Sequence, residues 1–185
     1  VIEIDMLSDA FDLGVKHVTT NIALSQIMGT GIEYQYDGKT YHFNKGVVDA
    51  YDKTISALSN KGMTVTVILL NDWNPNTPDL VYPGTQKNSN AFYYMFNAET
   101  EAGFDQTKAI ASFLAQHYSG DNPNYGKVSN WIIGNEINNQ QWNYMGPMDL
   151  TNYVKAYQKA FRVIYTAIKS TNANDRVYFS LDYNW

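Results

Sequence analysis

The residues best suited to do chemistry are Asn135 and Glu136, which lie in the segment 128–139, VSNWIIGNEINN. Residues 129–134 are a short, largely apolar and β-branched run of the kind found in strands buried on both faces, and Gly134 ends the run. A carboxyl group at such a strand end can transfer a proton, and the neighbouring amide can hydrogen-bond a ligand. In parallel α/β proteins ligands bind at the carboxyl end of the sheet. The sequence therefore predicts a site in which Glu136 is the working acid.

The segments around this pair alternate between helical and strand patterns. Apolar spacing predicts helices at 6–13, from Asn44 to Gly62, at 105–118 and from Asp149 to Ile168. Strands are expected at 17–22, 63–70, 129–134 and 176–181. This alternation predicts an α/β fold with a parallel sheet and right-handed crossovers. No linker divides the chain, so we expect one domain, residues 1–185.

Two excursions interrupt the alternation. Asp37-Gly38, flanked by alternating aromatic and polar residues, predicts a two-residue β-hairpin within 31–43. Residues 71–98 form a long loop rich in Pro, Asn and Gly. A loop of that length in a compact domain usually serves a function.

Polar or aromatic residues follow every predicted strand. Because the strands are expected to be parallel, their carboxyl ends form one edge of the sheet, which we call the carboxyl rim. Asn and Asp also begin turns, so at any single strand the pattern is explained as well by a turn. All four strands together, with two Trp among them, favour ligand binding. The expected contacts, with two residues from the loop after Glu136, are Asn21, Asn71, Trp73, Asn135, Asn138, Trp142, Asp182 and Trp185.

Composition excludes several classes of partner and cofactor. The net charge is -5, with 13 Lys+Arg and no basic run, which argues against nucleic acid and against an anionic membrane surface. No apolar run approaches the roughly 20 residues that cross a bilayer. Cysteine is absent and the three His lie on separate elements, so we expect neither a metal site nor a cofactor. Aromatic residues make up 15% of the chain, which suits binding to sugar rings, although most of them are expected to fill the core.

The segment 131–136, WIIGNE, resembles the fourth-strand signature of clan A glycoside hydrolases. Those enzymes are (β/α)8 TIM barrels in which an Asn-Glu pair ends the fourth strand. Residues 9–18 and the WIIGNEIN segment also resemble an uncharacterised bacterial family in the same superfamily. The resemblance implies that this chain holds only part of a barrel, about strands two to five, and that residues 1–5 belong to the loop after a first strand. It also implies a secreted or cell-surface location.

The resemblance assigns roles to the residues. It implies that Glu136 is the general acid/base of a retaining glycosidase and that Asn135 hydrogen-bonds the sugar 2-hydroxyl. Such enzymes need a second Glu after strand seven, so the nucleophile is expected outside this chain. A wider pair formed by Glu136 and Asp182 would suit an inverting mechanism, and Asp182 could instead orient Glu136.

Part of a barrel would leave unpaired strand edges. We therefore expect the remainder of the barrel, or a second copy of the chain, to cover them. Two alternatives remain open. One is a non-catalytic carbohydrate-binding protein on a degenerate barrel, which the missing nucleophile would explain. The other is a structural module that assembles through its exposed edges.

Overall fold

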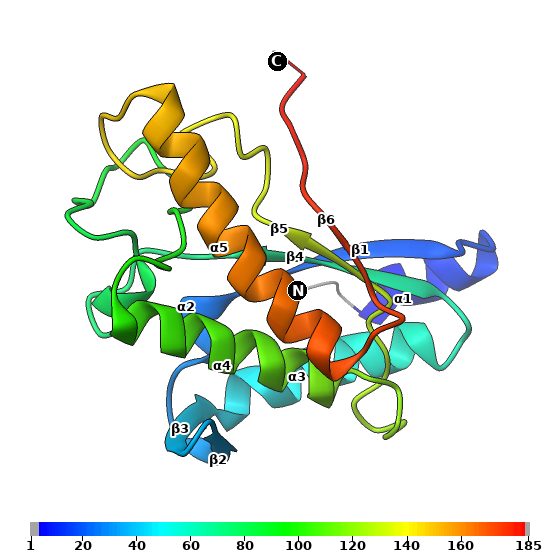
Figure 1. The fold of residues 1–185 in the computed structure, drawn as a ribbon. Coiled ribbons are helices and arrows are strands. Elements are labelled where there is room, and N and C mark those ends of the chain that lie inside the picture. Colours follow the sequence, from blue (N-terminus) through cyan, green and yellow to red (C-terminus); the bar gives the residue numbers. More distant parts are fainter. Residues whose placement is uncertain (1–3, 184–185) are drawn as a thin grey trace.

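The computed structural model describes residues 4–183 as a mixed α/β fold built on a parallel sheet (Figure 1). The order of the strands in the sheet is β1-β4-β5-β6, so neighbours in the chain are neighbours in space. Every pairing is parallel, as the alternating pattern predicts. The four strands are β1 (His17–Ala23), β4 (Thr64–Leu70), β5 (Asn130–Ile133) and β6 (Arg176–Tyr178).

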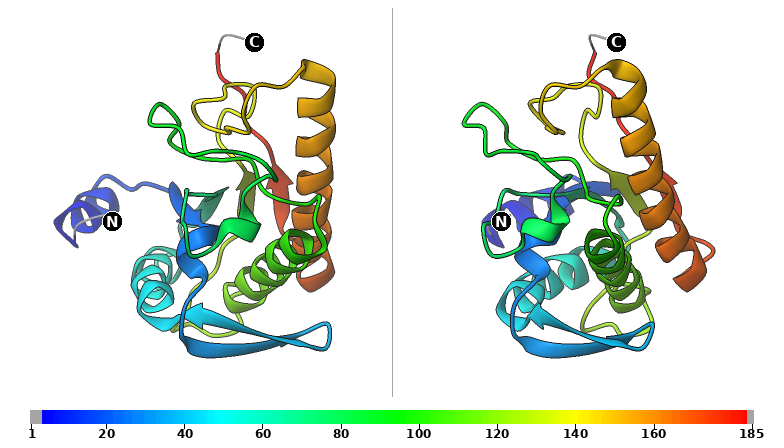
Figure 2. Two further views of the ribbon diagram at one scale, coloured as in Figure 1. Left: turned by 90° about the vertical axis from the view of Figure 1, so that its left-hand side faces the viewer. Right: turned by 60° about the vertical axis from the view of Figure 1, so that its left-hand side comes forward.

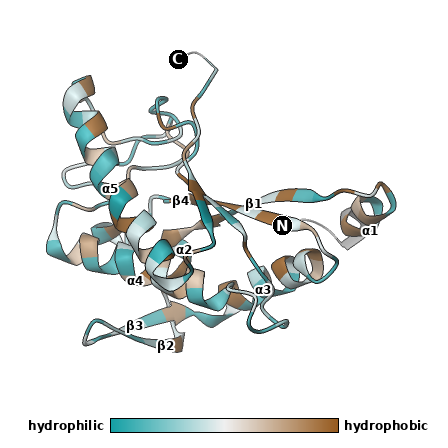
Figure 3. Ribbon diagram, turned by 45° about the vertical axis from the view of Figure 1, so that its right-hand side comes forward, coloured by the Kyte–Doolittle hydropathy of each residue, from teal (hydrophilic) through white to brown (hydrophobic). Residues whose placement is uncertain are grey.

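Three long helices connect these strands: α3 (Lys45–Ser59), α4 (Glu101–His117) and α5 (Leu150–Thr171). They lie on one side of the sheet (Figure 2), and hydrophobic and hydrophilic bands alternate along them (Figure 3). Along β4, Val65, Val67 and Leu69 are buried, whereas Thr66 and Ile68 between them are only half-buried. The alternation follows from the period of two along a strand and shows that one face of the sheet is less well covered.

The helix starts follow local chemistry that the sequence predicts in two of three cases. Asn44 caps α3 through its side-chain oxygen, which accepts a hydrogen bond from the Val47 N–H at 3.2 Å, and Asp149 caps α5 in the same way. The third helix, α4, begins at Glu101, four residues earlier than expected, because Thr100 caps it. Gly103 in its first turn lowers helix propensity. A Cβ there would lie 2.5 Å from the Asp79 carbonyl oxygen, so this close approach requires glycine.

The smaller elements agree with the prediction at the hairpin and differ at the last strand. Strands β2 (Gly31–Tyr36) and β3 (Lys39–Asn44) are antiparallel and turn at Asp37-Gly38, both with positive φ. Strand β6 stops at Tyr178, short of the expected end at residue 181, because its ladder with β5 ends with the pair Ile132–Tyr178. The remaining short elements are α1 (Ile4–Asp12), α2 (Leu24–Ile27) and the 3₁₀ turn η1 (Pro78–Leu80) in the long loop.

Trp131 is at the centre of the core and is fully buried. Its indole N–H donates to the Asp175 carboxylate at 2.8 Å, and Asp175 is itself only 2% exposed. Burial raises the pKa of Asp175, while the indole hydrogen bond and the positive charges of Lys127 and Lys169 oppose that rise. The core therefore contains an acid that binds its proton more tightly in the native state than in the unfolded chain.

This acid makes stability depend on pH in a defined direction. As pH rises above the ordinary value of 3.8, unfolded chains release the Asp175 proton that native molecules still hold. The contribution of Asp175 to stability therefore falls until pH exceeds its raised native pKa. Asp175→Asn keeps an acceptor for the indole and does not titrate, so its stability relative to the native protein should increase from pH 3.5 to pH 7. Urea unfolding across that range measures this, and a pH-independent difference would contradict it.

Candidate functional site

The loops after β4 and β5 leave the sheet at the same edge, the carboxyl rim, and pair with each other. The ladder of β4 and β5 places Leu69 beside Ile133, so the segments that follow start side by side. Backbone hydrogen bonds then join the loops: Phe92 N–H donates to Gln141 O at 2.8 Å and Tyr144 N–H to Tyr93 O at 2.9 Å. Residues 141–144, in the loop that follows Glu136, are therefore held against residues 92–93 of the long loop 71–98.

Glu136 has a left-handed backbone, with φ of 44°. Among residues 4–183 the only other non-glycine residue with positive φ is Asp37, which the hairpin turn explains. Left-handed φ costs a residue with a side chain about 1 kcal/mol or more and persists where the surroundings impose it, often at functional sites. Here Ser180 contributes to that constraint, because its hydroxyl accepts the Glu136 N–H at 2.9 Å and its carbonyl accepts the Ile137 N–H at 3.1 Å.

Two tyrosines on α5 hold the same turn from the helix side. The Tyr157 hydroxyl donates to Ile133 O at 2.6 Å, and the Tyr153 hydroxyl donates to Ile137 O at 2.7 Å. Both rings are buried, and burial raises the pKa of Tyr153 to about 12 and that of Tyr157 further still. They remain protonated donors at neutral pH. With Ser180 they form what we call the Glu136 clamp.

The acidic side chain in this clamp is half-buried. Within the described residues no salt bridge involves Glu136. Asp182 is nearby in the fold: its backbone N–H donates to the Asn138 side chain at 2.7 Å and its carboxylate accepts from Asn139 at 3.0 Å. Asn138 and Asp182 therefore meet, as predicted for the carboxyl rim, and Asn139, which the sequence did not single out, orients Asp182.

Three other predicted contacts hold or pack against residues of the long loop 71–98. Asn71 is fully buried and its side chain donates to Leu80 O at 2.8 Å, so it holds the long loop and does not face solvent. The Trp73 ring packs 5.3 Å from Tyr94 and the Trp142 ring 4.8 Å from Phe92, both centroid distances, and both indoles are half-buried. Asn135 is half-buried in the turn itself. Trp185 lies outside the described residues.

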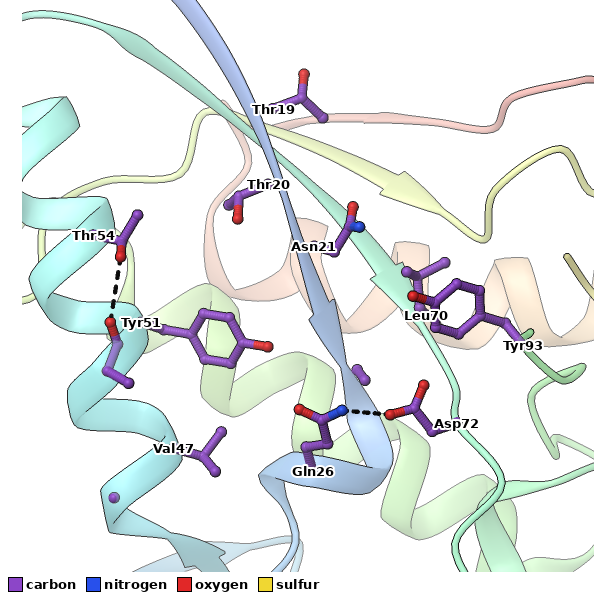
Figure 4. Close-up of a pocket in the computed structure, with 13 residues that line it drawn as sticks. Thr19, Thr20, Asn21, Gln26, Val47, Tyr51, Thr54, Leu70, Asp72 and Tyr93 are labelled. Atoms are coloured by element: carbon purple, nitrogen blue, oxygen red, sulfur yellow. Dashed lines mark hydrogen bonds between the residues drawn. The ribbon is translucent and has the colours of Figure 1, made fainter. Parts of the chain in front are cut away.

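A cavity of about 610 Å³ opens at the free edge of β1, and we call it the β1 cavity (Figure 4). The Gln26 amide donates to the Asp72 carboxylate there, and Asp72 is the only charged residue in the lining. The phenols of Tyr51 and Tyr93 also line it, and the Tyr51 hydroxyl points into the space between α3 and β1 (Figure 4). Burial and the Asp72 charge raise the pKa of both phenols. Of the predicted contacts, only Asn21 lies here.

Tyr51 and Tyr93 carried no signal that would have placed them at this cavity. Tyr51 stands in the apolar stripe of α3, where spacing indicates a core residue. Tyr93 stands in an aromatic run of the long loop. Asp72, adjacent to a strand end, fits a turn equally well.

Within residues 4–183, no group of three or more His, Asp or Glu side chains is arranged to hold a metal ion. In the same part of the chain, no helix has both the length and the apolar character to cross a membrane.

Comparison with solved structures identifies a protein of Bacillus halodurans C-125 that is provisionally named an alpha-N-acetylgalactosaminidase. The identity is 10% and the TM-score 0.45, with 95% of this chain and 42% of that chain covered. The chain thus spans less than half the length of that protein. No curated protein matches the chain by sequence. The model of a family of unknown function, DUF5722, matches residues 1–185, and the chain therefore belongs to that family.

Proposed function

We propose that this chain is part of a (β/α)8 glycosidase-type barrel, about strands two to five, and that it takes part in hydrolysis of O-glycosidic bonds. The observation that carries the proposal is the position of Glu136. It follows the inner strand β5 of a parallel sheet, in a left-handed conformation that neighbouring elements impose. Such imposed strain, on a residue whose side chain can transfer protons, is characteristic of a catalytic position.

The proposed chemistry assigns one proton transfer to each half of the reaction. Glu136 protonates the glycosidic oxygen as the glycosidic bond breaks and the nucleophile bonds to the sugar. It then removes a proton from the water that displaces the nucleophile from the sugar. Asn135 hydrogen-bonds the sugar 2-hydroxyl. The nucleophile of this retaining mechanism lies outside the chain. Asp182, held by Asn139, orients the site or binds a hydroxyl group.

The free edges of the sheet support the partial barrel. Strands β1 and β6 each have one neighbour in the sheet among the described residues, so one side of each is unpaired. Beyond β6 the chain exposes Phe179 by 55% and Leu181 by 42%. We propose that the remainder of a barrel covers these edges and apolar side chains, with a second copy of the chain as the alternative cover.

The β1 cavity favours a second candidate function, non-catalytic carbohydrate binding. Its lining combines phenols, amides and hydroxyl groups with the single carboxylate of Asp72. That mixture suits a neutral polyhydroxylated ligand, because rings can pack on its C–H faces and polar groups can bond its hydroxyls.

Hydrolysis separates these two functions. We expect the full-length protein that contains this chain to release product from at least one member of a panel of aryl glycosides and oligosaccharides. Proton NMR of the first product formed should show the anomer of the substrate, as retention requires. Binding by calorimetry without any turnover would support the second function instead. Absence of both turnover and binding would overturn both.

A further inference from the structure

Helices α4 and α5 pack against each other and leave a groove of about 490 Å³ on their outer side, which we call the α4–α5 groove. It lies on the helix layer, because all of its lining residues belong to α4 and α5, whereas Glu136 lies at the carboxyl rim after β5. The residues that line it are Phe104, Lys108, Lys155, Gln158, Lys159, Arg162, Val163 and Thr166. No Asp or Glu is among them.

The charge of this groove is opposite to that of the chain. Four of the 13 Lys+Arg residues line it, although the formal net charge is -5. Lys155, Lys159 and Arg162 recur at spacings of four and three along α5, so they form one ridge. From the first to the last, the ridge is roughly 10 Å long at the rise of an α-helix. It matches about two turns of a helix or a few residues of extended chain.

Two of the four cations form no salt bridge with the described residues. Lys108 pairs with Asp37 at 3.2 Å and Lys159 with Glu99 at 2.7 Å. Among residues 4–183, neither Lys155 nor Arg162 takes part in a salt bridge. A guanidinium is suited to paired hydrogen bonds with a carboxylate. The groove therefore offers exposed positive charge of a kind that selects carboxylates.

The floor of the groove is apolar. Phe104 exposes 36% of its surface beside the buried Val163. A partly exposed ring that shares a groove with charged side chains is common at protein-binding surfaces, where an apolar anchor inserts beside polar contacts. An inorganic anion would gain nothing from this ring.

We propose that the α4–α5 groove binds an acidic segment of a partner protein, with carboxylates on Lys155 and Arg162 and one apolar side chain on Phe104. A long polyanion such as nucleic acid extends beyond the groove, so the net negative charge of the chain repels it. This repulsion between exposed charges acts over about one Debye length. A short acidic peptide with an apolar anchor interacts mainly with the positive charges that line the groove. This surface operates whether or not Glu136 is catalytic.

Selection from a random peptide display library tests the proposal. The full-length protein is the target, and Lys155→Glu/Arg162→Glu is used for subtraction. Lys53→Glu/Lys87→Glu, at two exposed lysines outside the groove, makes the same change in net charge and is the control. We expect enriched peptides to contain at least two Asp or Glu and one large apolar residue. Enrichment without an acidic bias would overturn the proposal.

Affinities of the best peptide complete the test. Fluorescence anisotropy should show at least about tenfold weaker binding to Lys155→Glu/Arg162→Glu. Phe104→Ala should weaken binding about fivefold, since it removes the apolar contact. The control variant should bind like the native protein. Equal weakening in the control would reduce the effect to net charge, and tighter binding of a short single-stranded oligonucleotide than of the peptide would identify a polyanion site instead.

Discussion

Glu136→Gln should lower kcat/KM for the proposed glycoside hydrolysis by about 10²- to 10⁴-fold, the range that general acid/base catalysis contributes. The amide retains the size of the side chain, and the Ser180 hydrogen bond to the backbone N–H does not depend on it. Stability should therefore change by no more than about 0.5 kcal/mol, as at other non-core positions. Initial rates on the active substrate, with a urea unfolding curve for each protein, measure both quantities.

The matched control for this variant is Glu33→Gln, which removes one carboxylate from an exposed position on β2. It should retain native turnover. Substrates with a very good leaving group should lose less activity in Glu136→Gln, because their departure needs little protonation. Unchanged turnover in Glu136→Gln would remove this residue from the mechanism. A loss of equal size in both variants would assign the effect to net charge.

Trp131→Ala should destabilise the fold by about 3–5 kcal/mol, the usual cost of deleting a large aromatic core side chain. The side chain is fully buried, so its removal leaves a cavity beneath the sheet, and Asp175 loses its indole donor. Trp142→Ala is the comparison. That ring packs on a loop and is half-buried, so its loss should cost about 1 kcal/mol. Equilibrium urea unfolding gives both values.

Trp131→Phe serves if the alanine variant does not fold. It keeps most of the buried volume and deletes the indole N–H, and should cost about 1–3 kcal/mol because the Asp175 carboxylate loses its partner. Equal costs for Trp131→Ala and Trp142→Ala would contradict the structure, since they would imply equal burial of the two rings.

Much of the scaffold could be predicted because its signals are local. Periodicity located the four strands, the Asp37-Gly38 pair predicted the hairpin, and Asn44 and Asp149 predicted two helix starts. The start of α4 was wrong because Gly103 disfavours helix locally and is required by a contact with Asp79, distant in sequence. The start of α4 therefore depends on a tertiary contact, and the local sequence pattern does not show that contact.

The candidate site could be predicted only where chain order determines proximity. Parallel strands bring Glu136, Asn138 and Asp182 to one edge, and the structure places the last two in contact. The roles of Tyr153 and Tyr157 could not be predicted. The spacing of residues along a helix is the same whether a tyrosine only packs in the core or also donates its hydroxyl to a backbone carbonyl. Asn71 followed a strand like the other residues, yet its amide turns inward.

Ser180 belongs to the segment after β6, yet it accepts hydrogen bonds from the backbone N–H groups of Glu136 and Ile137 in the loop after β5. The backbone conformation of Glu136 therefore depends on the segments after both β5 and β6. A displacement of the segment after β6 should change the position of the Glu136 backbone. Substitutions at Phe179 or Leu181, which flank Ser180 in the chain, should then lower the turnover that we propose for Glu136. Under the proposed function, substitutions that abolish turnover should fall at these positions after β6 as well as at Glu136.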